Sequence, residues 1–188
     1  MDAGEFGCIT SPMQGNLIPA KAVWCADNGR FGRGWPGRDR YLRWLDTLEP
    51  AADRCQFVVL PDVPFDMPRS LELSMSYLPD LARTPFPIAL ALQNGAEDME
   101  LPWGEIQAVF IAGDDQWKLG HAAVTLIHEA LTKNLWTHLA RVNSARRWRF
   151  ACGVGADSSD GTFFSVAPDK NLARQRRWHR RETQGVLI

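Results

Sequence analysis

Residues 88–95 read Ile88-Ala89-Leu90-Ala91-Leu92 followed directly by Gln93-Asn94-Gly95. A short, continuously apolar run of this kind is typical of a parallel β-strand that is buried on both faces. The polar and glycine residues that follow mark the point where the strand ends and a loop begins. The same combination of an apolar run and a polar ending recurs along the chain, and it decides the expected fold.

The other apolar runs alternate with longer amphipathic stretches. Further strand-like runs lie at 8–10, 22–25, 56–60, 108–112, 137–140 and 149–152. Helix-like stretches lie at 38–48, 68–82, 118–133 and 169–181. Strands that alternate with helices imply βαβ units and a parallel sheet. We therefore expect an α/β fold, a compact (β/α) TIM-like barrel that is complete or lacks a strand, with an open doubly wound sheet as the alternative.

Composition is that of one globular domain. The 188 residues are 45% hydrophobic and 23% charged, as in ordinary soluble proteins, and they are few for two domains. We therefore expect a single domain over residues 1–188. No apolar run approaches the roughly 20 residues that span a bilayer, and the first residues do not resemble a signal peptide. The four cysteines are scattered singly, so neither a zinc site nor a disulfide framework is expected, and a cytoplasmic location is the simplest.

Charge is distributed unevenly along the chain. Residues 141–181 hold ten Lys and Arg against three Asp, a charge of +7, so the remainder must carry −8 to give the net charge of −1. A basic segment of this kind is typical of a protein that binds a polyanion, although a solvated helix face is the alternative for residues 170–181.

Small polar or acidic residues follow almost every predicted strand. Asp27, Asp62, Gln93 and the pair Gly113-Asp114 occupy such positions. The carboxyl ends of parallel barrel strands meet on one face, where active sites are built. A single Asp after a strand is often a helix N-cap, but capping alone does not explain the recurrence over six successive strands. The pattern predicts a functional rim.

The cluster Gly155-Ala156-Asp157-Ser158-Ser159-Asp160-Gly161-Thr162 supplies two more carboxylates. We expect it to follow a last strand at 149–152. The surrounding residues are too small to cover Asp157 and Asp160, which suits a carboxylate that must approach a substrate carbon. An Asx-type turn capped by its own side chains is the alternative.

Such a set of groups suits a purine-like ring and its sugar. Carboxylate oxygens accept hydrogen bonds from ring N–H and amino groups, whereas an amide or backbone N–H donates to a carbonyl oxygen. A further carboxylate could attack the anomeric carbon and hold a covalent glycosyl intermediate while a second acid transfers the proton.

The ordered strand-end motifs resemble those of the tRNA-guanine transglycosylases (queuine tRNA-ribosyltransferases). The closest likeness is to their compact bacteriophage relatives, which place 7-deazaguanines in DNA. The resemblance covers about residues 22–165. The motifs are Ala26-Asp27-Asn28-Gly29, Leu60-Pro61-Asp62, Leu92-Gln93-Asn94-Gly95, Ile111-Ala112-Gly113 and Gly155-Ala156-Asp157-Ser158-Ser159-Asp160.

The resemblance implies a role for each matched residue. Asp160 corresponds to the family nucleophile, and Asp27 to the Asp implicated in proton transfer. The remaining residues are implied to bind the base, through the side chains of Asp62 and Gln93, the backbone N–H of Gly113, and Asp157 as a supporting acid.

Differences between this sequence and the family motifs bear on which substrate is expected. The family zinc motif of three closely spaced cysteines and a histidine is absent, so no metal or other cofactor is expected. Asp114 replaces the second glycine of the family Gly-Gly turn, and the chain is short for an added RNA-binding domain. DNA is therefore favoured over tRNA as the polymer, with a 7-deazaguanine such as preQ0 as the small-molecule substrate. A phage protein of this kind would act in the cytoplasm of its host cell.

The basic segment is expected to bind DNA phosphates. Its candidate contacts are Arg146, Arg147, Arg149, Arg174, Arg176, Arg177, Arg180 and Arg181, the last five on a basic C-terminal helix at about 169–181. Two other functions stay open. One is a nucleoside hydrolase or deoxyribosyltransferase that acts on free nucleotides, and the other is a non-catalytic DNA-binding barrel.

The basic segment predicts a steep dependence of DNA affinity on salt. If about six phosphates are contacted, raising the salt from 50 to 200 mM should weaken binding about a thousandfold, because condensed counterions are released on binding. Fluorescence anisotropy of a labelled oligonucleotide measures this slope, and replacing Arg174, Arg176, Arg177 and Arg180 by Gln should flatten it. A flat slope in the unmodified chain would remove the assignment.

Overall fold

A computed structural model describes residues 6–14, 17–32, 34–164 and 166–184, with the side chains of 164, 168 and 181–184 outside that description. The strands are β1 (Cys8–Thr10), β2 (Trp24–Ala26), β3 (Cys55–Val59), β4 (Ile88–Leu92), β5 (Ala108–Ile111), β6 (Trp136–Leu139) and β7 (Ser158–Ser159). The helices are α1 (Arg38–Asp46), α2 (Met67–Leu81), α3 (Asp115–Lys118), α4 (His121–Thr132), α5 (Ala145–Gly153) and α6 (Pro168–Gln184). Short 3₁₀ turns are η1 (Glu49–Arg54), η2 (Ala96–Asp98) and η3 (Thr162–Phe164).

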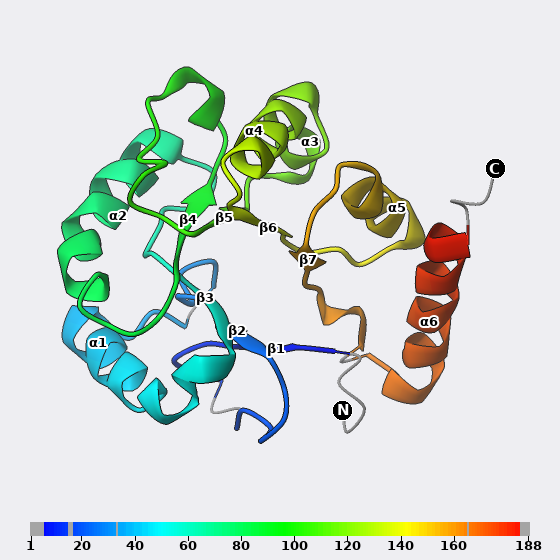
Figure 1. Cartoon of the computed structure of the whole chain (residues 1–188), viewed down its shortest axis with the longest axis horizontal. Coiled ribbons are helices and arrows are strands. Elements are labelled where there is room, and N and C mark those ends of the chain that lie inside the picture. Colours follow the sequence, from blue (N-terminus) through cyan, green and yellow to red (C-terminus); the bar gives the residue numbers. More distant parts are fainter. Residues whose placement is uncertain (1–5, 15–16, 33, 165, 185–188) are drawn as a thin grey trace.

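All the strands lie parallel in one curled sheet, in the order in which they occur along the chain. Helices cover its outer face, and α5 and α6 lie side by side at one end of the sheet (Figure 1). Within the described residues β1 and β7 are the edge strands. The predicted α/β TIM-like barrel fold is confirmed, as a seven-stranded, incompletely closed form of a barrel that has eight strands when complete.

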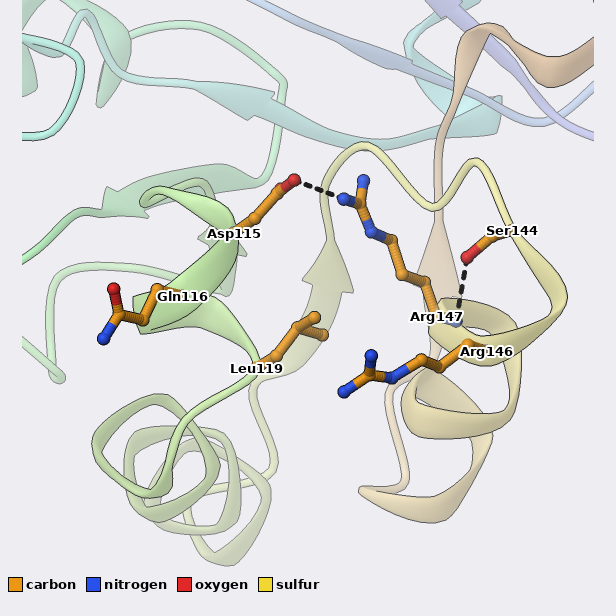
Figure 2. A pocket seen from close by; sticks show the side chains of 6 residues that line it. All are labelled: Asp115, Gln116, Leu119, Ser144, Arg146 and Arg147. Carbon is orange, nitrogen blue, oxygen red and sulfur yellow. Dashed lines mark hydrogen bonds and ion pairs between the residues drawn. The ribbon is translucent and has the colours of Figure 1, made fainter.

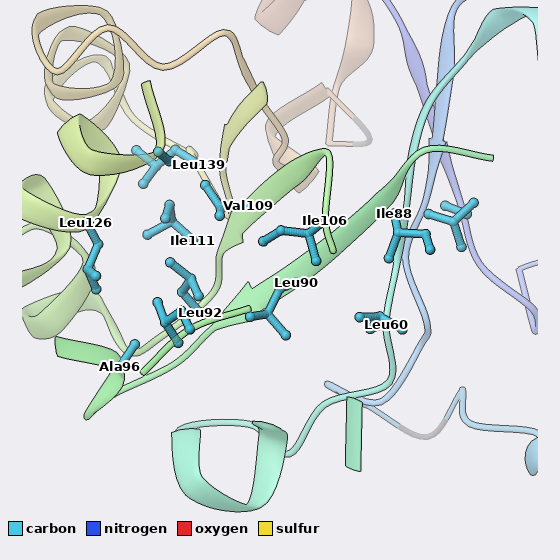
Figure 3. Packing of buried hydrophobic residues seen from close by; sticks show 14 of the residues in the cluster. Leu60, Ile88, Leu90, Leu92, Ala96, Ile106, Val109, Ile111, Leu126 and Leu139 are labelled. Carbon is cyan, nitrogen blue, oxygen red and sulfur yellow. The ribbon is translucent and has the colours of Figure 1, made fainter. Parts of the chain in front are cut away.

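Alternation along the strands creates two hydrophobic clusters. Leu90, Val109 and Ile111 face outward and pack with helix residues such as Leu126 (Figure 3). The other cluster is made by strand residues that point inside the curl, namely Cys25, Phe57, Val59, Ala89, Ala91, Ala108, Phe110, Ala112 and Ala140. Successive side chains of a strand point to opposite faces, so the parity of a position decides which cluster it joins.

One predicted strand is a helix. Residues 149–152 lie in α5, and the last strand is β7 at Ser158–Ser159. The apolar run Phe150-Ala151-Cys152 is too short to distinguish a strand from a buried helix segment. The deciding signal is Ser144, whose side chain accepts a hydrogen bond from the backbone N–H of Arg147 and so caps the helix.

The other elements match their predicted positions to within a few residues. The strand predicted at 88–92 is β4 itself. The long helix predicted at 118–133 is α4, which begins at His121 after the short, unpredicted α3, and the basic helix predicted at 169–181 is α6. No helix among the described residues is long and apolar enough to cross a membrane.

The outer cluster predicts where the fold is most sensitive to truncation. Leu90 is completely buried between the sheet and the helices, so Leu90→Ala should lower the free energy of unfolding by about 2–5 kcal/mol through lost burial and the cavity left behind. Urea unfolding followed by tryptophan fluorescence measures the change. Leu17→Ala is the control, because Leu17 is 91% exposed and its truncation should leave stability nearly unchanged. Equal losses in the two variants would contradict the assigned core.

Candidate functional site

Three carboxylates lie together at the carboxyl ends of the strands. Asp27 follows β2, Asp62 lies beyond the end of β3, and Asp160 follows β7. Asp27 lies two residues after Cys25, and Asp160 two residues after Ser158, so each continues the row of side chains that points inside the curl. The charges of Asp62 and Asp160 both act on Asp27, so three of the predicted site residues do converge at the mouth of the barrel.

Asp160 is held as an ionised carboxylate. Its Oδ1 accepts a hydrogen bond from the backbone N–H of Arg141 at 2.8 Å and lies 3.3 Å from Nε2 of His138. Burial alone would raise the pKa of Asp160, but the hydrogen bond from His138, the Arg141 N–H and the charge of Lys118 together hold it below its ordinary value. Asp160 is therefore charged at neutral pH.

Asp27 has the opposite tendency. Burial, aided by the negative charges of Asp62 and Asp160, raises the pKa of Asp27 from 3.8 to about 6. Its Oδ1 accepts a hydrogen bond from the backbone N–H of Gly29 at 3.2 Å, which opposes that rise only in part. Two carboxyl groups at one mouth thus differ in their affinity for a proton, as in sites where one acid group donates and the other attacks or stabilises charge.

Asp62 belongs to a buried polar network. Its Oδ1 accepts from Nδ2 of Asn28 at 2.9 Å, and its Oδ2 accepts from Nε2 of Gln93 at 2.5 Å. Asn28, Asp62 and Gln93 are 1%, 6% and 2% exposed, so the two predicted base-binding side chains contact each other and lie below the surface of the mouth. Burial raises the pKa of Asp62, an effect that the two hydrogen bonds offset in part.

Two loops at the mouth hold bulky residues at positive φ. Phe65 has φ 67° and Arg141 has φ 60°, a conformation that costs of order 1–3 kcal/mol for such residues. Each is held by a site side chain, because the Phe65 N–H donates to Oε1 of Gln93 at 2.9 Å and the Arg141 N–H donates to Asp160. Gln93 and Asp160 therefore shape the mouth as well as facing it.

An aromatic cover lies over this mouth. Phe31 and Phe65 are 56% and 46% exposed, and their rings meet edge to face at 5.9 Å. The Arg141 guanidinium lies 4.5 Å from the centre of the Phe31 ring and donates to the carbonyl oxygens of Ala112 and Gly113. The cover thus offers exposed π-faces and a fixed cation on the loops that Gln93 and Asp160 hold.

Two charged or titratable residues of the site were missed by the sequence analysis. His138 is 3% exposed inside the barrel, and Lys118 is completely buried. Lys118 donates from Nζ to the Ala140 carbonyl at 2.9 Å and pairs with Asp115 at 3.0 Å, and burial lowers its pKa. His138 could have been found from its position two residues before Ala140, because alternate residues of a strand point to the same face and Ala140 points inside the curl. Nothing in the sequence pointed to Lys118.

Asp157 does not belong to the site, contrary to the prediction. It precedes β7, whereas Asp160 follows it, and three residues of a strand separate positions by about 10 Å and turn them to opposite faces. Its Oδ2 instead accepts from the N–H and the hydroxyl of Thr137, at 2.8 and 3.0 Å. Asp157 therefore ties the start of β7 to β6, and the misplaced last strand explains the error.

The predicted role of Gly113 is also wrong. Its N–H donates to the carbonyl of Leu92 at 3.2 Å and is not free for a base. A Cβ at this position would lie 2.3 Å from the Trp117 ring and 2.9 Å from Oδ1 of Asn94, so glycine is required by close packing. Asp114, beside it, caps α3 by accepting from the N–H of Trp117.

The predicted phosphate-binding arginines fall into three groups. Arg147 is occupied within the protein, because its guanidinium pairs with Asp115 and donates to the Arg141 carbonyl, so its assignment as a free phosphate contact is wrong. The exposed arginines are Arg146 and Arg149 on α5, and Arg174, Arg176, Arg177 and Arg180 on α6. The side chain of Arg181 lies outside the described residues.

A surface pocket lies between α3 and the start of α5. Asp115, Gln116, Leu119, Ser144, Arg146 and Arg147 line it. Figure 2 shows the Arg147 side chain extending across to Asp115, while Arg146 reaches toward the pocket without an ion pair drawn. The pocket contains none of the three mouth carboxylates. Within the described parts of the chain, no group of three or more His, Cys, Asp and Glu is arranged to hold a metal ion.

Comparison with solved structures supports the fold. The chain is similar to a protein from Agrobacterium tumefaciens described as a glycerophosphoryl diester phosphodiesterase, with a TM-score of 0.50 at 11% identity. The match covers 82% of this chain and 60% of that one, less than two thirds of its length. At this identity the likeness shows the fold alone. No protein-family model matches the sequence, and a comparison with curated proteins gives no match.

The raised pKa of Asp27 predicts a stability change with pH. Between pH 3.8 and about 6 the folded state binds more protons than the unfolded chain, so stability falls as the pH rises. Asp27→Asn keeps the acceptor for Gly29 but cannot ionise. It should therefore be about 1–3 kcal/mol more stable than the parent at pH 7.5 and nearly equal to it at pH 4.

Urea unfolding at pH 4, 5.5 and 7.5 tests this expectation. Asp98→Asn is the control for the loss of a carboxylate from the surface, because Asp98 is exposed on η2. A difference for Asp27→Asn that stays constant over this range would show that Asp27 has an ordinary pKa.

Proposed function

We propose that this chain is a glycosyltransferase that exchanges a base at a glycosidic bond, replacing guanine in DNA with a 7-deazaguanine of the preQ0 type. One observation carries the proposal: Asp160 and Asp27 lie at the same mouth, and their pKa values are shifted in opposite directions. The pKa of Asp160 is lowered and that of Asp27 is raised to about 6, which suits a nucleophile and a general acid.

The first step forms a covalent glycosyl-enzyme. A carboxylate oxygen of Asp160 attacks C1′ of the target nucleotide, and the bond from C1′ to the base nitrogen breaks. The electron pair of that bond goes to the departing guanine, which takes the proton from Asp27. C1′ is inaccessible inside a stacked duplex, so the target nucleotide must be turned out of the helix first.

The second step reverses the first with a different base. Asp27, now ionised, takes the ring N–H proton of the 7-deazaguanine as that nitrogen attacks C1′, and the ester bond to Asp160 breaks. Both carboxyl groups return to their starting states, so no oxidant or energy source is consumed. Two displacements at one carbon retain its configuration.

The contacts proposed for the base differ from those expected from the sequence, because Asp62 and the rings of Phe31 and Phe65 would bind it. An ionised carboxylate has about four acceptor positions, and Asp62 uses two of them for Asn28 and Gln93. Asp62 could therefore accept from a base edge while it keeps its network. The exposed rings of Phe31 and Phe65 offer the adjacent apolar surface that a flat heterocycle requires.

The choice of guanine and of DNA rests on two supports. The ordered strand-end motifs resemble those of enzymes that handle guanine and 7-deazaguanines. Exposed arginines on α5 and α6 would contact the phosphates of the polymer. Action on free nucleosides is a second candidate, because the clustered rings of Phe31 and Phe65 suit a small, flat substrate.

The two aspartates of the β7 segment provide a matched test of the mechanism. Asp160→Asn can still accept from the Arg141 N–H but cannot attack C1′, so exchange should fall by at least about 1000-fold. Asp157→Asn, at the other end of β7, should leave exchange within a few-fold of the parent. Mass spectrometry of DNA digested after incubation with protein and preQ0 measures incorporation, and denaturing gels detect a covalent DNA adduct.

Each outcome decides between the candidates. Exchange that persists in Asp160→Asn would remove Asp160 as nucleophile. Incorporation into free nucleosides alone would favour the nucleoside-processing reaction. DNA binding without exchange or adduct would show a non-catalytic barrel.

A further inference from the structure

Four side chains on the inner face of β6 and β7 form a continuous hydrogen-bonded row. Nε1 of Trp136 lies 2.8 Å from Oγ of Ser158, which lies 2.8 Å from Nδ1 of His138. Nε2 of His138 lies 3.3 Å from Oδ1 of Asp160. His138 and Ser158 are direct register partners in the parallel pair, which is why the row crosses between the two strands.

The donors and acceptors allow this row one continuous direction, from Trp136 to Asp160. An indole N–H can only donate, so Oγ of Ser158 accepts from Trp136 and can use its own hydrogen toward Nδ1 of His138. A histidine that accepts at Nδ1 carries its proton at Nε2, which then donates to the carboxylate of Asp160. We propose that Trp136, Ser158 and His138 form a relay that holds neutral His138 in its Nε2–H tautomer and thereby positions Asp160.

Packing keeps the imidazole in this orientation. The His138 ring is stacked on Phe110, with centroids 4.8 Å apart and planes 7° apart, and meets the edge of Phe57 at 5.3 Å. The side chain is buried, so a ring flip would have to move both phenyl groups. His138 contacts Asp160 and not the mouth, which makes it a positioning residue for the proposed nucleophile.

The relay also distinguishes the two oxygens of Asp160. His138 and the N–H of Arg141 both donate to Oδ1. Among the described residues no hydrogen bond is made to Oδ2. Oδ2 of Asp160 is therefore the attacking oxygen and Oδ1 the anchored one, an assignment that rests on the proposed function.

Other charged or titratable groups also face Asp160. Lys118 and Arg141 favour its ionised form, whereas Asp27 and Cys25 interact with it from β2. These groups remain when His138 is replaced. Loss of the His138 hydrogen bond should therefore raise the pKa of Asp160 without neutralising it at pH 7.

The tautomer can be measured without any activity assay. In protein with ¹⁵N-labelled histidine, long-range ¹H–¹⁵N spectra should show His138 as the neutral Nε2–H form at pH 7 in the parent. Ser158→Ala should shift or broaden the signal of His138 Nδ1, because the hydrogen-bond donor to that nitrogen is lost. The signals of His128, which is exposed on α4, should stay unchanged. A neutral Nδ1–H form or an imidazolium in the parent would overturn the relay.

Activity then tests the positioning role. His138→Gln retains an amide donor in place of Nε2–H and should keep exchange within about tenfold. His138→Phe should lose about 10- to 100-fold and move the acidic limb of kcat/KM to higher pH, as expected when a charge-assisted hydrogen bond is removed. His128→Gln is the control on an exposed surface.

The outcomes separate the two proposals. If the parent shows no exchange while His138 has the expected tautomer, the proposed function fails and the relay stands as a structural element. If Asp160→Asn is inactive but His138→Phe has the parent pH profile, the positioning role fails. Ser158→Ala gives the same comparison should His138→Phe not fold.

Discussion

The interior of the curled sheet has to be filled by side chains from the strands alone, and the rest of the structure depends on that constraint. The inner cluster combines alanines on β4 and β5 with the large rings of Phe57 and Phe110. Small residues at Ala89, Ala91 and Ala108 leave the volume that the rings occupy. His138 completes this stack, so the imidazole beside Asp160 is fixed by the same packing that stabilises the barrel.

The mouth above this interior combines strain with buried charge. Phe65 and Arg141 adopt unfavourable backbone conformations, and both are held through side chains that face the mouth. Asp62 and Gln93 are largely withdrawn from solvent. Groups of this kind lower stability unless they are fully hydrogen-bonded, which is why they are expected at a functional site and not elsewhere. The arrangement supports chemistry at the mouth without specifying a substrate.

The fold could be read from local pattern to a large extent. Continuously apolar runs such as the one that ends at Leu92 have few alternatives to a buried parallel strand, and β4 begins and ends where the pattern places it. The exception is α5, where an apolar run of three residues fits either a helix or a strand. That error moved the last strand and brought Asp157 into the predicted site, because a strand and a helix place neighbouring side chains differently.

The sequence by itself determined the alternation of strands and helices, the parallel sheet and the position of Asp27 at a strand end, because these follow from local hydrophobic periodicity. Only the tertiary structure decided the states and partners of the site residues. The pKa of Asp160 is lowered by a hydrogen bond from His138 on a neighbouring strand, and that of Asp27 is raised by burial and by carboxylates far away in the chain. Such effects fall off over a few ångströms in space and have no fixed spacing in sequence, so only the folded chain reveals them.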